Sequence, residues 1–337
     1  MDTKRHRLTA FVGLALAISA CAFGRSCADD LPPLYVTLVI HTEEDLGGGT
    51  VPKPSIPDYD GDEALMNHFA SVMRAFAEMA SEHGAAINFG SDWTFSRGVE
   101  RYEPTFYSDL EALGHEIDAH AHESSVLYHD VREAITTAGG NPSHVASGLD
   151  EAEIHDRLTY FDVYWPEFSI LWGVALPGHT AGECIASWVW RPSRDDWTQH
   201  DPEGDYIYIG HGDLVNSIHA VREAVESRQA DRVNTIALFT TPREFKAAPG
   251  TEGVAEAWTA AVESPDYWEN RIAWWNEMFT QLEPLVESGA VHFATLTQIA
   301  EAFEAIEDGL SFDRSEVPRS TLGMRQRNAR AGYPFEY

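Results

Sequence analysis

The chain has 337 residues and is 44% hydrophobic, which is enough for one large α/β domain or two small ones with a sizeable core. Its 54 acidic residues against 23 basic ones give a formal net charge of −31 at pH 7. This balance argues against a nucleic-acid-binding protein, because such a protein needs a basic surface that contacts phosphates.

Residues 1–28 are predicted to be an export signal. The basic segment Lys4–Arg7 precedes Leu8–Phe23, a run of 16 mostly apolar residues that is too short for a comfortable membrane span. The sequence offers two alternative cleavage sites for this signal. The string that ends at Cys21 resembles a bacterial lipobox, which would leave a lipid anchor there, and Ser26–Ala28 fits ordinary signal peptidase. We therefore expect an exported bacterial protein that is periplasmic, secreted or an outer-membrane lipoprotein, without a membrane-spanning segment.

After this signal, apolar segments typical of strands alternate with segments of helical periodicity. The predicted strands are Leu34–His41, Ala85–Phe89, His115–Ala119, Ala186–Trp190, Tyr206–Gly210, Thr235–Thr240 and Val291–Thr295. The predicted helices are Glu63–His83, Pro104–Leu113, Glu151–Tyr164, Ile218–Arg228, Val254–Ser288 and Leu296–Glu307. The alternation favours a parallel sheet or barrel with helices outside it, in one domain over residues 29–310. Residues 311–337 are polar and lack periodicity, so we expect a C-terminal extension.

Chemically active residue types lie at or just after the ends of several predicted strands. They are His41, Glu43, Glu44, Asp92, Trp93, His120, His122, Trp190, Arg191 and His211. In parallel α/β folds the carboxyl ends of the strands meet at one edge, where active sites lie. We therefore expect these side chains to collect at one rim.

Two histidines at the end of the third predicted strand are the best candidates for metal ligands. His120 and His122 stand two residues apart, and residues i and i+2 of a strand point to the same side. Imidazole nitrogens are common ligands of divalent metals. The alternative is a pair of solvated loop histidines, and the spacing alone does not decide between the two.

With these motifs the chain resembles the polysaccharide deacetylase (carbohydrate esterase) superfamily. The acidic segment after the first strand is one matching element. Gly114–His120 is similar to the family's "GHEIGxH" motif, Arg191-Pro192 to its "RxP" motif, and His292–Leu296 to its final strand. The resemblance covers residues 34–306 and implies an α/β fold, the distorted (β/α)7 barrel of the polysaccharide deacetylase type.

The resemblance implies metal-assisted hydrolysis of N- or O-acetyl groups on a carbohydrate substrate. The family holds a divalent metal, usually zinc, with one carboxylate and two histidines, so Glu44, His120 and His122 would be the ligands here. Glu43 would be the catalytic base, although the two glutamates could exchange these roles. In such a site the metal polarises the acetyl carbonyl and lowers the pKa of a bound water.

Three further residues are candidates for catalysis. His41 ends the first strand, where it would be either another nitrogen ligand or a structural hydrogen-bonding group. Arg191 would orient a carboxylate or contact the substrate. His211 would replace the late histidine of the family, because Thr240-Thr241 stand at that place. The family's second histidine ligand also lies one or two residues beyond the position of His122.

Three tryptophans are candidates for stacking on sugar rings: Trp93, Trp190 and Trp197. Trp197 follows the polar run Ser193–Asp196, which favours an exposed position. The alternative for each is packing in the core, the commoner place for a large aromatic side chain.

Two other functions fit parts of the sequence. One is a glycan-binding barrel without catalysis, which the displaced second histidine and the missing late histidine favour. The other is a metal-dependent hydrolase of the metallo-β-lactamase type, suggested by the strings at His120–His122, Pro177–Thr180 and Gly210–Gly212. Helices precede these histidines, however, whereas that fold begins with hairpins.

Overall fold

The computed structural model describes residues 31–42, 59–121, 126–149, 167–173, 186–196, 199–212, 216–245 and 265–307. All of them belong to one compact unit, Leu31–Tyr337. The predicted export signal, the predicted helix Glu151–Tyr164 and the C-terminal extension lie outside the described residues. In the described ranges no helix is both long and apolar enough to cross a membrane.

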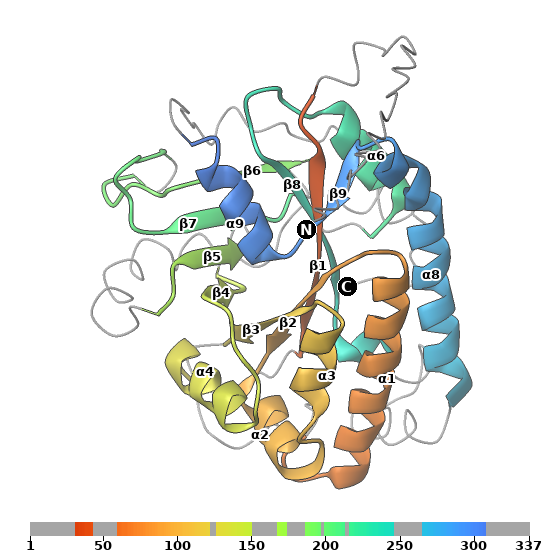
Figure 1. The fold of residues 1–337 in the computed structure, drawn as a ribbon. Coiled ribbons are helices and arrows are strands. Elements are labelled where there is room, and N and C mark those ends of the chain that lie inside the picture. The colour runs from red at the N-terminus through yellow and green to blue at the C-terminus, as the bar shows by residue number, and fades with distance from the viewer. Residues whose placement is uncertain are drawn as a thin grey trace, which may run out of the picture. The chain divides into compact units, whose positions relative to one another are not determined.

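The described strands form one closed sheet. They are β1 (Leu34–His41), β2 (Ile87–Ser91), β3 (Glu116–His120), β4 (Val145–Ser147), β5 (Ile170–Gly173), β6 (Ser187–Trp190), β7 (Ile207–Gly210), β8 (Asn234–Thr240) and β9 (Val291–Phe293). Their order is β2-β3-β4-β5-β7-β6-β8-β1-β9, and β1 also pairs with β2, so eight strands close into a ring. One edge of β1 is shared, because β9 pairs with Leu34–Val36 and β2 with Leu38–His41. The fold is therefore a closed α/β barrel of eight strands (Figure 1).

Seven α-helices and one 3-10 helix lie in the described ranges. They are α1 (Glu63–Glu82), α2 (Trp93–Tyr102), α3 (Phe106–Ala112), α4 (Tyr128–Thr137), α6 (Ile218–Glu226), η3 (Pro242–Phe245), α8 (Pro265–Glu287) and α9 (Leu296–Glu304). Helix α1 packs beside α8 and also contacts α2 and α3 (Figure 1). Helices α1, α2, α3 and α8 pack on the outer face of the barrel wall.

Helix α1 begins and ends where its sequence predicts. The Asp62 carboxylate accepts a hydrogen bond of 3.0 Å from the Leu65 amide, which caps the first turn. Gly84 follows the helix with a φ of +68°, a conformation that glycine adopts without strain. The apolar face of α1, with Phe69 and Phe76, is buried against the sheet.

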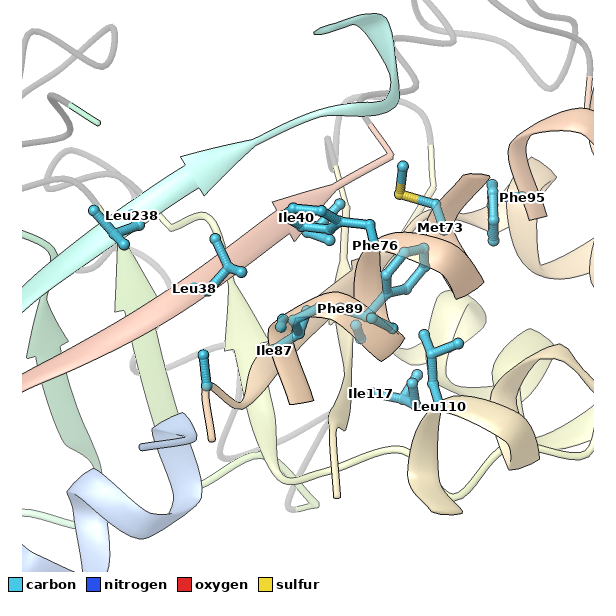
Figure 2. Packing of buried hydrophobic residues seen from close by; sticks show 14 of the residues in the cluster. Leu38, Ile40, Met73, Phe76, Ile87, Phe89, Phe95, Leu110, Ile117 and Leu238 are labelled. Atoms are coloured by element: carbon cyan, nitrogen blue, oxygen red, sulfur yellow. The ribbon is translucent and has the colours of Figure 1, made fainter. Parts of the chain in front are cut away.

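The two faces of the barrel wall bury different side chains of β1. Leu38 and Ile40 point outward and share a cluster with Phe76 of α1 (Figure 2). Val39 belongs to a second, inner cluster with residues of β5, β7 and α9. Because alternate residues of a strand point to opposite faces, His41 lies on the inner face with Val39.

Helix α9 lies across the amino-terminal end of the barrel. The Leu296 amide donates to Oδ1 of Asn88 on β2 at 3.1 Å. The Thr297 amide donates to Oε1 of Glu116 on β3 at 3.3 Å. The buried face of α9, which includes Ile299, extends the inner cluster. The carboxyl ends of the parallel strands lie at the opposite end of the barrel.

The predicted α/β architecture is confirmed, but the strands differ in number and direction. The ring has eight strands rather than the seven expected, and β4 and β5 are absent from the prediction. Strand β6 runs antiparallel to β7 and β8. The described residues between β6 and β7, 191–196 and 199–206, contain no helix. A parallel neighbour needs a long crossover, which is usually a helix, whereas an antiparallel one does not.

The metallo-β-lactamase alternative is wrong for this fold. Strands β1 to β5 pair with one another in parallel along the ring. Parallel neighbours cannot be hairpins, because a hairpin joins antiparallel strands.

Candidate functional site

Two imidazole rings stack at the carboxyl end of the parallel strands. His41 ends β1, His120 ends β3, and both residues are 1% exposed. Their ring centroids lie 3.6 Å apart, with an interplanar angle of 15°. Since β1 and β3 flank β2, the rings meet across that strand on the inner face. The structure thus brings together two of the histidines that the sequence singles out.

Ser147, the last residue of β4, forms a hydrogen bond with each of the two rings. Its hydroxyl lies 2.9 Å from Nε2 of His41. Its carbonyl oxygen lies 2.7 Å from Nδ1 of His120. The same carbonyl accepts a hydrogen bond of 3.0 Å from the Tyr128 hydroxyl on α4. One residue therefore orients two histidines through two different groups.

Asp92 reaches the same cluster from the end of β2. It precedes α2 and is 3% exposed. Its Oδ1 lies 3.8 Å from Nε2 of His120. The Asp92 amide donates a hydrogen bond of 2.9 Å to the hydroxyl of Thr42, which follows β1, and this bond holds Asp92 beside that strand. The site therefore joins the ends of three neighbouring strands.

Aromatic rings surround the histidine pair on the inner face. The ring of His41 is edge-on to Trp172 of β5 and to Phe239 of β8, at centroid distances of 5.5 and 5.1 Å. Trp172 lies 6.0 Å from the ring of His211, which follows β7. Nδ1 of His211 lies 2.6 Å from the Gly212 carbonyl oxygen. In such apolar surroundings, electrostatic interactions between charged groups are stronger than in water.

A polar network occupies the inner face one layer below the histidines. Asn88 donates through Nδ2 to the carboxylates of Glu116 and Asp118, at 2.7 and 2.9 Å. The Thr37 hydroxyl donates to Oδ1 of Asn88 at 2.9 Å, and the Ser143 hydroxyl to Asp118 at 2.5 Å. Burial, and then repulsion from the Glu116 carboxylate, raises the pKa of Asp118 well above its ordinary value.

Trp190 and Arg191 lie away from the histidine pair. Because β6 is antiparallel, its carboxyl end lies at the amino-terminal end of the other strands. There the Arg191 guanidinium binds Glu307 at 2.6 Å and Glu304 at 3.2 Å, at the end of α9. Trp190 is 1% exposed and packs on Tyr208, with ring centroids 4.6 Å apart. The expectation that both residues join the rim is wrong, because it assumed a parallel strand.

Of the other predicted site residues, only Trp93 lies within the part of the chain that the structure describes. Trp93 is the half-buried first residue of α2, and the Arg97 guanidinium lies 4.5 Å from its ring centroid. The rest lie outside the described residues and stay predictions: Glu43, Glu44, His122 and Trp197.

The described residues supply part of a metal site. Two parallel rings 3.6 Å apart cannot both ligate one ion, because each zinc–nitrogen bond is about 2.0–2.1 Å long and lies in its ring plane. His120 and Asp92 do fit one ion, since ligand atoms 3.8 Å apart can both reach a zinc at about 2.0–2.2 Å. Among the described side chains no group of three or more His, Cys, Asp or Glu could hold a metal. The third ligand therefore stays a prediction.

Three residues of this site have little signal in the sequence. Asp92 follows a predicted strand but belongs to no motif. Ser147 and Trp172 lie on β4 and β5, strands of three and four residues that are too short for a clear pattern. Gly148, directly after Ser147, is the one mark of a special backbone position there.

The fold and the site define an α/β barrel with a buried cluster of histidine and aspartate at the carboxyl end of its parallel strands. No protein-family model and no curated protein matches the chain. Among solved structures it is similar to a 4-alpha-glucanotransferase from Thermococcus litoralis, with a TM-score of 0.45 and 11% sequence identity. The match covers 80% of this chain and 38% of that enzyme, so the chain spans well under half of the length of its structural neighbour.

Proposed function

We propose that the protein is a hydrolase that removes acetyl groups from a carbohydrate at the carboxyl end of the barrel. The convergence of His41, His120 and Asp92 from three strand ends is the observation that carries this proposal. It places nitrogen and carboxylate groups where α/β barrels hold their active sites. The resemblance of Gly114–His120 to a deacetylase motif supplies the reaction type.

We assign His120 and Asp92 to the binding of a divalent metal, with zinc the expected ion. Glu44 or His122 would complete a set of three protein ligands. The ion, when bound, would polarise the acetyl carbonyl and make a bound water more acidic.

The protein's own side chains would carry the protons of the reaction. Glu43 would accept a proton from the attacking water while the oxygen of that water bonds to the acetyl carbon. The bond from that carbon to the sugar nitrogen or oxygen then breaks, and a histidine, His41 or His211, would donate a proton to the leaving group. The products are acetate and the deacetylated carbohydrate.

Metal content and acetate release test this proposal together. The purified full chain should hold about one metal ion and release acetate from an acetylated glycan or a model ester. His120→Ala should lower metal occupancy and acetate release at least about tenfold, because a ligand is lost. His219→Ala, at an exposed position on α6, is the control and should behave as wild type. A metal-free wild-type protein that releases no acetate would refute the proposal.

A carbohydrate-binding barrel without catalysis is the second candidate. The departures from the deacetylase motifs favour it, because Thr240-Thr241 stand where that family has its late histidine. In that case glycan binding should persist in the presence of a chelator and in His120→Ala, with no acetate formed.

We also propose that the chain is exported, on the evidence of its basic and apolar first 28 residues. Mass spectrometry of the mature protein distinguishes the two cleavage sites. A lipid-bearing N-terminus at Cys21 indicates an anchored protein, and an unmodified N-terminus at Asp29 indicates ordinary signal peptidase. Retention of the intact leader in the cytoplasm would contradict export.

A further inference from the structure

We infer that the turn Ser147-Gly148 at the end of β4 is a positioning element that holds the proton of neutral His120 on Nδ1 and presents its unprotonated Nε2 to Asp92. The inference deepens the proposed function, because metal binding or base chemistry at Nε2 needs that lone pair. The position of the proton is itself measurable without any activity.

The tautomer follows from the chemistry of the two hydrogen-bonding groups. The Ser147 carbonyl oxygen can only accept, so Nδ1 of His120, 2.7 Å away, must be the donor. A neutral imidazole has a single N–H, so Nε2 then carries the lone pair. Nε2 is the atom that lies 3.8 Å from Oδ1 of Asp92. Carbonyl groups that accept from the far nitrogen of a histidine orient metal ligands in the same way.

Ser147 is itself held in place. Its carbonyl oxygen also accepts from the Tyr128 hydroxyl at 3.0 Å. Strand β4 pairs with β3 on one side, opposite His120, and with β5 on the other, opposite Trp172. The acceptor therefore belongs to the barrel wall rather than to a loop.

Gly148 allows the histidine rings to approach this backbone. Its φ is +99°, in the region that favours glycine. A Cβ atom there would lie 2.6 Å from Cε1 and Nδ1 of His120 and 3.1 Å from Cε1 of His41. These atoms belong to two rigid rings that stack on each other. A side chain at position 148 must therefore displace the rings or the Ser147 carbonyl group.

Nitrogen NMR of the full chain with 15N-labelled histidine tests the inference. In the wild type at a pH where the ring is neutral, the His120 signals should show a protonated Nδ1 and an unprotonated Nε2. His120→Gln identifies these signals by their loss. Gly148→Ala should shift them or change the tautomer, because the added methyl group collides with the ring.

Gly114→Ala is the matched control for backbone strain. Its φ is +88°, close to that of Gly148, and a Cβ atom there meets nothing within 4 Å. It should carry similar backbone strain without the collision, and it should leave the His120 signals unchanged. A protonated Nε2 in wild-type His120, or equal spectral changes in the two alanine variants, would overturn the inference.

Two milder variants keep the test decisive if Gly148→Ala does not fold. Ser147→Ala keeps the carbonyl but removes the hydroxyl, so it should change the His41 signals and leave the His120 tautomer intact. Tyr128→Phe removes the second donor to the carbonyl and should shift Nδ1 of His120 only. The reverse pattern would contradict the assigned roles. A protein without acetate release but with the expected tautomer would refute the proposed function alone.

Discussion

At the scale of single residues, Asp118 shows how the barrel interior alters an ordinary side chain. It is fully buried on β3, one layer below His120, and its oxygens accept from Asn88 and Ser143. Burial has the largest effect on its pKa, and the negative charge of Glu116 adds to it. Both favour the neutral acid, so the folded protein holds a proton on Asp118 at pH values where the unfolded chain has lost it.

This difference predicts a stability that falls as pH rises. The ordinary pKa of 3.8 applies to the unfolded chain, and the folded pKa lies well above it. The folded state therefore binds more protons between these two values, and the free energy of unfolding falls with increasing pH across that window. Asp118→Asn should flatten this dependence in urea unfolding measured from pH 4 upward. Asp195→Asn, at an exposed position, is the control, and an unchanged slope in Asp118→Asn would contradict the explanation.

At the scale of elements, the strong patterns in the sequence predict the barrel. Leu34–His41 is a long apolar run and forms β1, and the periodic, capped segment after Asp62 forms α1. Strands β4 and β5 lack such a pattern because they are short and buried throughout. The direction of β6 depends on the connection that follows it, which local residue patterns do not encode.

The same distinction explains the site. His41 and His120 could be found in the sequence because each ends a predicted strand. Ser147 could not, because its role comes from partners that are distant in sequence. Its hydroxyl contacts His41, 106 positions away, and its carbonyl contacts His120, 27 positions away. The sequence predicts the wrong end of the barrel for Arg191 because it does not reveal that β6 is antiparallel to its neighbours.

Arg191 is accordingly predicted to stabilise α9 rather than to take part in catalysis. Its guanidinium is largely buried and binds Glu304 and Glu307 at the end of that helix. Arg191→Ala should lower the free energy of unfolding in urea by about 1–3 kcal/mol, because two charged hydrogen bonds are lost. The kcat/KM for acetate release by the folded variant should stay within about twofold of wild type.

Arg194→Ala is the control for Arg191→Ala. Arg194 pairs with Asp205 on the surface at 3.1 Å, and such exposed pairs contribute less than about 1 kcal/mol. If Arg191→Ala abolishes acetate release without lowering stability, Arg191 acts on the substrate after all.

At the scale of the whole molecule, the net charge of −31 predicts a stability that depends on salt. Like charges on a folded chain repel one another more strongly than on an expanded chain, which destabilises the folded state. The Debye length falls from about 30 Å at 0.01 M salt to about 8 Å at 0.15 M, so most of this repulsion is screened over that range. We therefore expect Tm to rise between 0.01 and 0.15 M NaCl, measured by calorimetry at constant pH. An uncharged solute at equal osmolality controls for effects other than screening, because it leaves charge repulsion unscreened. A Tm that falls with NaCl would show that the ion pairs of this protein, such as that of Arg191 with Glu307, outweigh the general repulsion among its carboxylates.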